Sequence, residues 1–202
     1  MIGIIDYGSG NLRSVVNAFR YLGQETKVYE NADNLDQAEK IVLPGVGSSK
    51  DAMQGLEERG FIRPLLDDIK KGKPFLGICL GLQLLFEQSS ETGGCGCLGL
   101  FSGEVKLFNG DKKFKIPQIG WNTVRVVNPD CPLFNGIKDN TYFYFVHSYY
   151  CDVTDKNIMC GETDYTIKYA SAVWKDNVYA VQFHPERSQK NGIKMLENFV
   201  KL

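Results

Sequence analysis

A cysteine stands where a buried strand is expected to pass straight into a helix. The segment KPFLGICLGLQLLF (73–86) has no loop residues between the two patterns, and Gly77 and Gly81 flank Cys79 as the glycines flank serine in G-x-S-x-G. Such a tight turn leaves no room for Cβ atoms on either side. The positive end of the helix dipole favours a thiolate there. We interpret Cys79 as a nucleophile, with a buried structural cysteine as the alternative.

A thiol nucleophile needs a base, and the chain has only two histidines, His147 and His184. His184 follows the apolar run VYAVQF (178–183), at a strand's carboxyl end, where open α/β sheets place their sites. The proline between His184 and Glu186 restricts the backbone, so the carboxylate could accept from the imidazole and fix its tautomer. His147 has no carboxylate close behind it, and we interpret it as a core or site-lining residue.

Three glycine-containing segments have two interpretations each. PGVG (44–47) offers backbone N–H groups suited to an oxyanion hole, or is only a turn. DYGSGN (6–11) resembles the start of a dinucleotide fingerprint, but Arg13 replaces the third glycine, which favours a tight strand-to-helix turn. PQIGWN (117–122), in a loop-like context, is either a partner-facing patch or the setting of a core tryptophan.

The elements that must position these residues follow an alternating pattern. Buried strands are expected at 2–6, 40–44, 73–78 and 178–183, and helices at 11–23, 61–72, 80–89 and 191–202. Between about 104 and 183, short strands with polar alternation predict antiparallel pairing. The sequence therefore predicts an α/β fold of three layers, α/β/α, with a mostly parallel central sheet and some antiparallel strands. We expect residues 1–202 to form one domain.

Composition limits the function classes. Apolar residues at 43% and charged residues at 23% are ordinary for a globular chain, and a formal net charge of −1 without like-charge runs argues against nucleic-acid binding. The beginning of the chain lacks a leader pattern, so we expect a cytoplasmic protein with no membrane partner. The six cysteines are expected to be free thiols. No second Cys or His pair stands at zinc-site spacing, so we expect neither a metal nor another cofactor.

These motifs together resemble a known family. G-I-C-L-G-L-Q (77–83), the distant H-P-E (184–186) and the upstream P-G-V-G (44–47) are similar to the class I, or triad, glutamine amidotransferases. More closely, IGIIDYGSGNLRSV, PGVG, PQIGWN, YFVHSYY and HPERS resemble the glutaminase subunits of imidazole glycerol phosphate synthase, over nearly the full chain.

The resemblance implies a role for each matching residue. Cys79 would attack the glutamine amide, His184 would protonate the departing ammonia and activate water, and Glu186 would orient His184. The residues implied for the oxyanion and for substrate binding are Gly45, Val46, Gly47, Leu80, Gln83, Glu91, Ser148 and Tyr149.

The resemblance also implies a partner. Such subunits form a heterodimer with a (β/α)₈-barrel synthase and pass it ammonia, with imidazole glycerol phosphate and AICAR as products in histidine biosynthesis. The residues implied for this interface are Asn11, Gln118, Trp121, Asn122, Tyr144 and Arg187. The chain departs from the common pattern at three positions: Gln118 replaces a frequent His, Ser49 an aromatic residue and Arg187 a frequent Lys. A paralogue that supplies ammonia for amidination of a surface-glycan sugar is therefore the alternative.

Two other classes of protein would show different sequence features. A Cys-dependent peptidase or chaperone-like hydrolase would share the cysteine elbow but would not be expected to combine H-P-E with PGVG. A non-enzymatic interaction module would lack a triad member, whereas Cys79, His184 and Glu186 are all present.

Overall fold

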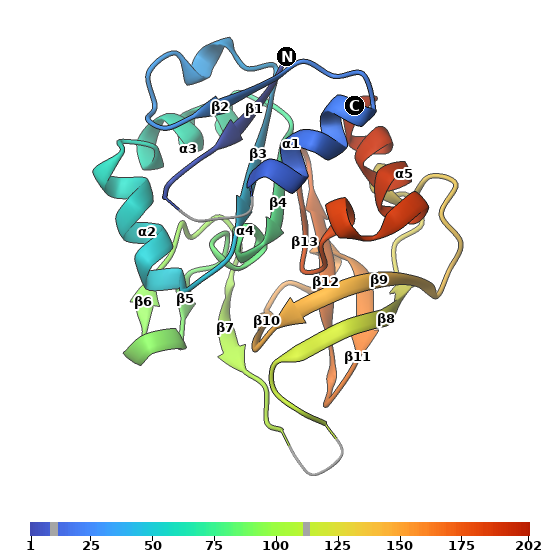
Figure 1. The fold of residues 1–202 in the computed structure, drawn as a ribbon. Coiled ribbons are helices and arrows are strands. Elements are labelled where there is room, and N and C mark those ends of the chain that lie inside the picture. Colours follow the sequence, from blue (N-terminus) through green and yellow to red (C-terminus); the bar gives the residue numbers. More distant parts are fainter. Residues whose placement is uncertain (9–11, 111–113) are drawn as a thin grey trace.

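The computed structural model describes residues 1–8, 12–110 and 114–202, and a mixed β-sheet runs through it (Figure 1). The strands follow the order β2-β1-β3-β4-β13-β12-β10-β7-β5-β6, while β11 joins β12 to β8, and β8 pairs with β9. The parallel part consists of β1 (Ile2–Ile5), β2 (Thr26–Tyr29), β3 (Lys40–Gly45), β4 (Phe75–Cys79) and β13 (Val178–Val181).

Helices cover both faces of the parallel part, which explains why the inner strands β1, β3, β4 and β13 are largely apolar, whereas the edge strand β2 is not (Figure 1). One face carries α1 (Leu12–Tyr21) and α5 (Gln189–Val200), and the rings of Phe19 and Phe199 meet there at 6.3 Å. The other face carries α2 (Ser49–Glu58) and α3 (Ile62–Lys70). The predicted layered α/β fold is confirmed.

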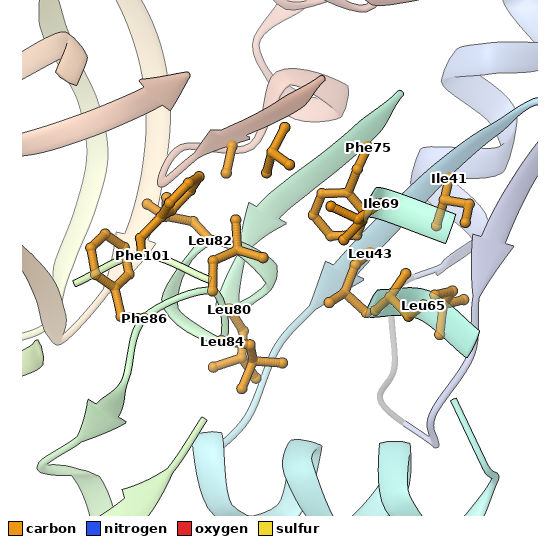
Figure 2. Close-up of a cluster of buried hydrophobic side chains, with 14 of the residues drawn as sticks. Ile41, Leu43, Leu65, Ile69, Phe75, Leu80, Leu82, Leu84, Phe86 and Phe101 are labelled. Carbon is orange, nitrogen blue, oxygen red and sulfur yellow. The ribbon is translucent and has the colours of Figure 1, made fainter. Parts of the chain in front are cut away.

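The core beneath α3 packs against the amino-terminal halves and the middle of strands β3 and β4. Figure 2 shows Leu65 and Ile69 of α3 beside Ile41, Leu43 and Phe75 of the sheet. Leu65, Ile41, Leu43 and Phe75 are fully buried. Truncating such a side chain typically costs about 2–5 kcal/mol, so this core contributes substantially to the stability of the sheet.

The rest of the sheet is largely antiparallel. Its strands are β5 (Gln88–Ser89), β6 (Cys95–Gly96), β7 (Gly103–Leu107), β8 (Gln118–Val126), β9 (Thr141–His147), β10 (Tyr149–Val153), β11 (Met159–Asp164) and β12 (Lys168–Lys175). In the described residues only β5–β7 is a parallel pair within this part. The predicted antiparallel pairing is confirmed and is more extensive than expected.

The helix predicted at 80–89 is wrong in its length. Helix α4 spans only Leu80–Gln83. Leu84, Leu85 and Phe86, the residues that follow it, are each fully buried. The carbonyls of these three residues accept backbone hydrogen bonds, at 2.8–2.9 Å, from the returning segment 98–101. The chain therefore leaves the helix because a neighbouring segment takes its carbonyl acceptors.

Elements without a strong apolar period also differ from the prediction. Strand β2 and helix α2 were not predicted, although Ser48 caps α2 by accepting from the Asp51 amide at 3.2 Å. PQIGWN (117–122) was expected in a loop, but residues 118–122 lie in β8 and pair with β9. Over the described ranges, no helix is both long enough and apolar enough to cross a membrane.

Candidate active site

Cys79 occupies a sharp turn between β4 and α4. Its φ of 56° and ψ of −105° are a strained combination for a residue with a side chain. A Cβ on Gly77 would lie 2.6 Å from the Gly81 carbonyl oxygen, and a Cβ on Gly81 would lie 1.8 Å from the Leu43 carbonyl oxygen. The prediction that both glycines are needed for space is confirmed, and the cysteine has the backbone geometry of a nucleophile elbow.

His184 and Glu186 follow β13, the strand next to β4. The register Val181↔Ile78 places the ends of the two strands side by side. The His184 Nδ1 and Glu186 Oε1 atoms are 2.8 Å apart, and the side chains are 3% and 1% exposed. Because a carboxylate only accepts, Nδ1 carries a proton. The predicted orienting contact is therefore present in the structure.

The surroundings of His184 favour its charged form. Burial by itself lowers the pKa of the imidazole, but the Cys79 sulfur and the Glu186 carboxylate outweigh burial and raise the pKa to about 10. His184 Nε2 is buried and has no hydrogen-bond partner among the described residues. The arrangement therefore favours an imidazolium beside the Cys79 sulfur, with Nε2 available to a reacting group.

A serine that the sequence reasoning missed holds this turn. Ser188 is 1% exposed, and its hydroxyl donates to the His184 carbonyl oxygen at 2.7 Å and accepts from the Tyr144 amide at 3.0 Å. The His184 amide donates in turn to the Tyr144 carbonyl oxygen at 2.9 Å. Strand β9 thus fixes the backbone of His184. A serine two residues after Glu186, at the start of a helix pattern, was the available signal.

A cavity of about 290 Å³ opens beside Cys79. This volume is near the lower end of the about 300–1,000 Å³ typical of ligand sites, and it suits a small amino acid. The lining residues are Val46, Gly47, Cys79, Leu80, Gln83, Glu91, Pro117, Val146, His147, Ser148 and Tyr149. The structure therefore gathers nearly all the residues expected at the oxyanion and substrate positions around one cavity.

Gly45 is the exception in that set. It is buried, does not line the cavity, and a Cβ there would lie 1.9 Å from the Tyr7 hydroxyl oxygen. Its role in the structure is close packing next to Cys79, its register partner on β4. Gly47 differs, because its φ of 99° requires glycine although a Cβ there would meet nothing within 4 Å.

Glu91 brings a negative charge to the cavity. It begins a short 3₁₀ turn between β5 and β6, and one carboxylate oxygen accepts from the Ser49 amide at the start of α2, at 2.7 Å. The N-terminus of a helix stabilises a carboxylate in this position. Glu91 is therefore held in place where a positively charged amino group would be attracted.

A buried amide that the sequence reasoning missed links Gln83 to Cys79. Gln83 Nε2 donates to the Tyr149 carbonyl oxygen and to Gln182 Oε1, each at 3.1 Å. Gln182 Nε2 lies 3.6 Å from the Cys79 sulfur. The signal was a glutamine within the otherwise apolar run 178–183.

His147 has different partners from His184. Its Nδ1 lies 2.7 Å from the Tyr149 carbonyl oxygen and its Nε2 lies 3.2 Å from the Tyr169 hydroxyl. Burial lowers the pKa of His147 to about 4, and the neighbouring His184 adds to this effect. A neutral histidine with both nitrogens occupied matches the expectation of a site-lining residue.

The residues expected at a partner interface do not form one surface. Trp121 and Tyr144 are register partners on β8 and β9, and their rings meet edge-to-face at 6.0 Å. Gln118 is 3% exposed and its side-chain amide lies 3.0 Å from the Tyr169 hydroxyl, so the prediction of a surface contact by Gln118 is wrong. Strand alternation places positions 118 and 121 on opposite faces.

The remaining interface residues have separate positions. Asn122 donates to the Asp164 carbonyl oxygen at 2.9 Å, which directs its amide along the sheet. Arg187 is exposed, next to Glu186. Asn11 lies outside the described residues.

Comparison with known proteins agrees with this geometry. Residues 3–202 match the family model described as glutamine amidotransferase class-I. The chain is 51% identical over 201 residues to the "Imidazole glycerol phosphate synthase subunit HisH" of Desulfitobacterium hafniense, covering 100% of this chain and 94% of the relative. It is 48% identical to the protein of the same name from Methanocaldococcus jannaschii, covering 100% of both chains.

Solved structures share the fold. The structure of PurLQS from Thermotoga maritima aligns with a TM-score of 0.79 at 21% identity, covering 99% of this chain and 97% of that one. A crystal structure of glutamine amidotransferase aligns with a TM-score of 0.76 at 16% identity, covering 99% and 97%.

The fold, the cysteine elbow and the full-length match define the class: the chain belongs to the class I glutamine amidotransferases. Within that family it belongs with the HisH subunits of imidazole glycerol phosphate synthase.

Proposed function

We propose that the chain hydrolyses glutamine to glutamate and ammonia and supplies the ammonia to a (β/α)₈-barrel synthase subunit in histidine biosynthesis. The observation that carries this proposal is the strained Cys79 elbow beside the buried His184–Glu186 pair, at the edge of a cavity of amino-acid size. The names of the relatives, each a subunit of imidazole glycerol phosphate synthase, support the choice of pathway.

The reaction proceeds in two halves. The Cys79 thiolate attacks the carbon of the glutamine side-chain amide, and the C–N bond breaks as the His184 imidazolium gives its proton to the departing nitrogen. Ammonia leaves and a thioester remains on Cys79. His184, now neutral, takes a proton from water, which attacks the thioester and releases glutamate. Glu186 keeps the His184 tautomer and stabilises its positive charge.

The cavity residues bind and polarise the substrate. Glu91 pairs with the α-ammonium group of glutamine, and Gln83, Ser148 and Tyr149 surround the rest of the amino acid. The negative oxygen of the tetrahedral intermediates is stabilised by the Leu80 amide at the start of α4 and by the amides of the 45–47 segment.

The exposed face of β8 and β9 is the proposed docking surface for the barrel subunit. Ile119, Trp121 and Tyr142 are 63%, 46% and 58% exposed, and strand pairing places them with Tyr144 on one face. Large exposed apolar side chains in one patch are typical of protein interfaces. Val146, on the same face of β9, also lines the cavity, so a partner bound here would sit where ammonia leaves.

The proposal also includes the domain organisation and the cellular location of the protein. Residues 1–202 act as one domain, which the continuous sheet between the two cores supports. The location is the cytoplasm, which the six unpaired cysteines support.

The test is Cys79→Ala in the complex with the barrel subunit. Glutamine-dependent turnover should be lost, while turnover on added ammonium salt should remain, because the acceptor reaction needs only ammonia. Cys131→Ala, which changes a buried cysteine beside Leu133, is the matched control and should keep both activities. Glutamine-dependent turnover by the Cys79→Ala complex would contradict the proposal.

A further inference from the structure

Gln182 is a fully buried polar side chain that takes no part in the proposed mechanism. It follows β13 directly and is 0% exposed, two residues before His184. Its backbone N–H donates to the Ser171 carbonyl oxygen at 2.9 Å. This hydrogen bond continues the pairing of β13 with β12 and fixes the backbone of Gln182. An unpaired buried amide costs about 1–3 kcal/mol, so the partners of this side chain are informative.

The hydrogen bonds determine how the side-chain amides of Gln83 and Gln182 are oriented. The Tyr149 carbonyl oxygen can only accept, so it must face the nitrogen of the Gln83 amide. The same nitrogen of Gln83 donates to Gln182 Oε1 at 3.1 Å, so the oxygen of the Gln182 amide faces Gln83. The nitrogen of the Gln182 amide therefore faces the Cys79 sulfur, at 3.6 Å.

This orientation determines what Gln83 can offer to a ligand. Both of its N–H groups are occupied, one by Tyr149 and one by Gln182. Gln83 lines the cavity, and its amide oxygen is the group that remains for a ligand. An oxygen accepts from N–H groups, which matches the amino and amide groups of glutamine.

We infer that Gln182 is a positioning residue, whose amide nitrogen donates to the Cys79 sulfur while its amide oxygen turns the Gln83 amide so that Gln83 presents an acceptor to the substrate. This inference rests on the proposed glutaminase function. It assigns to one buried side chain an effect on the nucleophile and an effect on substrate affinity, and the two effects can be measured separately.

The first measurement is the reactivity of the Cys79 thiolate. Iodoacetamide is added to the full-length chain across a range of pH, and alkylation of the peptide containing Cys79 is followed by mass spectrometry. In Gln182→Met the thiolate loses a donor, so the pH of half-maximal alkylation should rise by about 1 unit, the effect of one hydrogen bond to a charged group. The titratable groups that act on or face Cys79 are His184, Cys151 and Tyr169, together with Glu91, His147 and Tyr149 of the cavity lining, and none of them changes in this variant.

The second measurement is the kinetics of glutamate production in the complex with the barrel subunit. Gln182→Met should lower kcat and raise KM for glutamine, each by several-fold. Gln83→Met should raise KM without moving the alkylation midpoint, because Gln83 does not touch the sulfur. In the double variant, KM should equal that of Gln83→Met alone, because Gln182 affects affinity only through Gln83.

A matched control separates positioning from general loss of a buried amide. Asn198 on α5 is 6% exposed and donates to the carbonyl oxygens of Leu133 and Asn135, away from the cavity lining. Asn198→Leu should lower the melting temperature while keeping the alkylation midpoint and KM. Gln182→Asn, whose shorter amide cannot span both partners, serves as the second variant and should show the same shifts if Gln182→Met does not fold.

Two outcomes would overturn the inference while leaving the proposed function intact. The first is an unchanged alkylation midpoint in folded Gln182 variants of a complex that hydrolyses glutamine. The second is a fold-increase in KM in the double variant that equals the product of the fold-increases in the two single variants. Failure of the unmodified complex to hydrolyse glutamine would instead reject the proposed function.

Discussion

Replacing Gly81 with alanine tests whether the elbow requires the absence of a side chain. The added Cβ would lie 1.8 Å from the Leu43 carbonyl oxygen, whereas Cβ contacts under 3.0 Å are essentially never found. The backbone must therefore separate by at least 1.2 Å (3.0 − 1.8). Leu43 lies in β3, two residues before Gly45, which pairs with Cys79, so the displacement reaches the nucleophile.

The expected loss is both structural and catalytic. Overpacking of this kind costs about 1–3 kcal/mol. For a chain of this size each kcal/mol lowers Tm by about 2–4 °C, so Tm should fall by about 2–12 °C. A displacement of about 1 Å at the reacting groups reduces the rate by about 10²-fold, so kcat should fall by this factor even in the folded variant.

The assay is glutamate production by the complex together with thermal unfolding of the isolated chain. Gly96→Ala is the matched control, because a Cβ there meets nothing within 4 Å and its φ is not in the left-handed range. Gly96→Ala should keep both the rate and Tm. A Gly81→Ala variant indistinguishable from Gly96→Ala would refute the steric argument for the elbow.

Two other predictions concern the base and the partner. His184→Asn should lower glutamine-dependent kcat by about 10²–10⁴-fold, since general acid–base catalysis is lost. His147→Asn should mainly lower Tm or raise KM, because Tyr149 and Tyr169 lose a hydrogen-bond partner. Reversed effects of the two variants in steady-state kinetics and thermal unfolding would show that the wrong base was chosen. The isolated chain should hydrolyse glutamine slowly, and the barrel subunit with its acceptor substrate should raise the rate by about 10²–10³-fold. This is the effect of one additional N–H donor that points at the oxyanion in the form selected by binding. Glutamate production measured for the chain alone, with partner, and with partner plus acceptor tests this, and three equal rates would reject the switch but not the triad.

The sequence was sufficient to predict the parts of the site that depend on local geometry. Gly77, Gly81 and the proline before Glu186 act within a few residues of the group they position, so their meaning is visible in the chain itself. The buried runs of β1, β3, β4 and β13 were visible for the same reason, because strands covered on both faces are apolar throughout.

The missed features depend on residues far apart in the chain. Helix α4 ends early because residues 98–101 donate to the carbonyls of residues 84–86 that follow it, and no local sequence pattern predicts this contact. The role of Gln182 depends on its hydrogen bond with Gln83, which lies 99 positions earlier in the chain. Gln118 was assigned to the partner interface from the family resemblance, whereas strand alternation in β8 directs it inward.

The strand order also has a consequence for the time at which the site forms during folding. Strand β13 lies between β4 and β12, although 98 residues (80–177) separate it from β4 in the chain. Contacts of such large sequence separation are slow to form, because a long loop must close first. A nascent chain that has been synthesised only as far as β12 has its cysteine but not His184. Such a chain cannot consume glutamine, so we expect hydrolysis to begin only after β13 has inserted into the sheet.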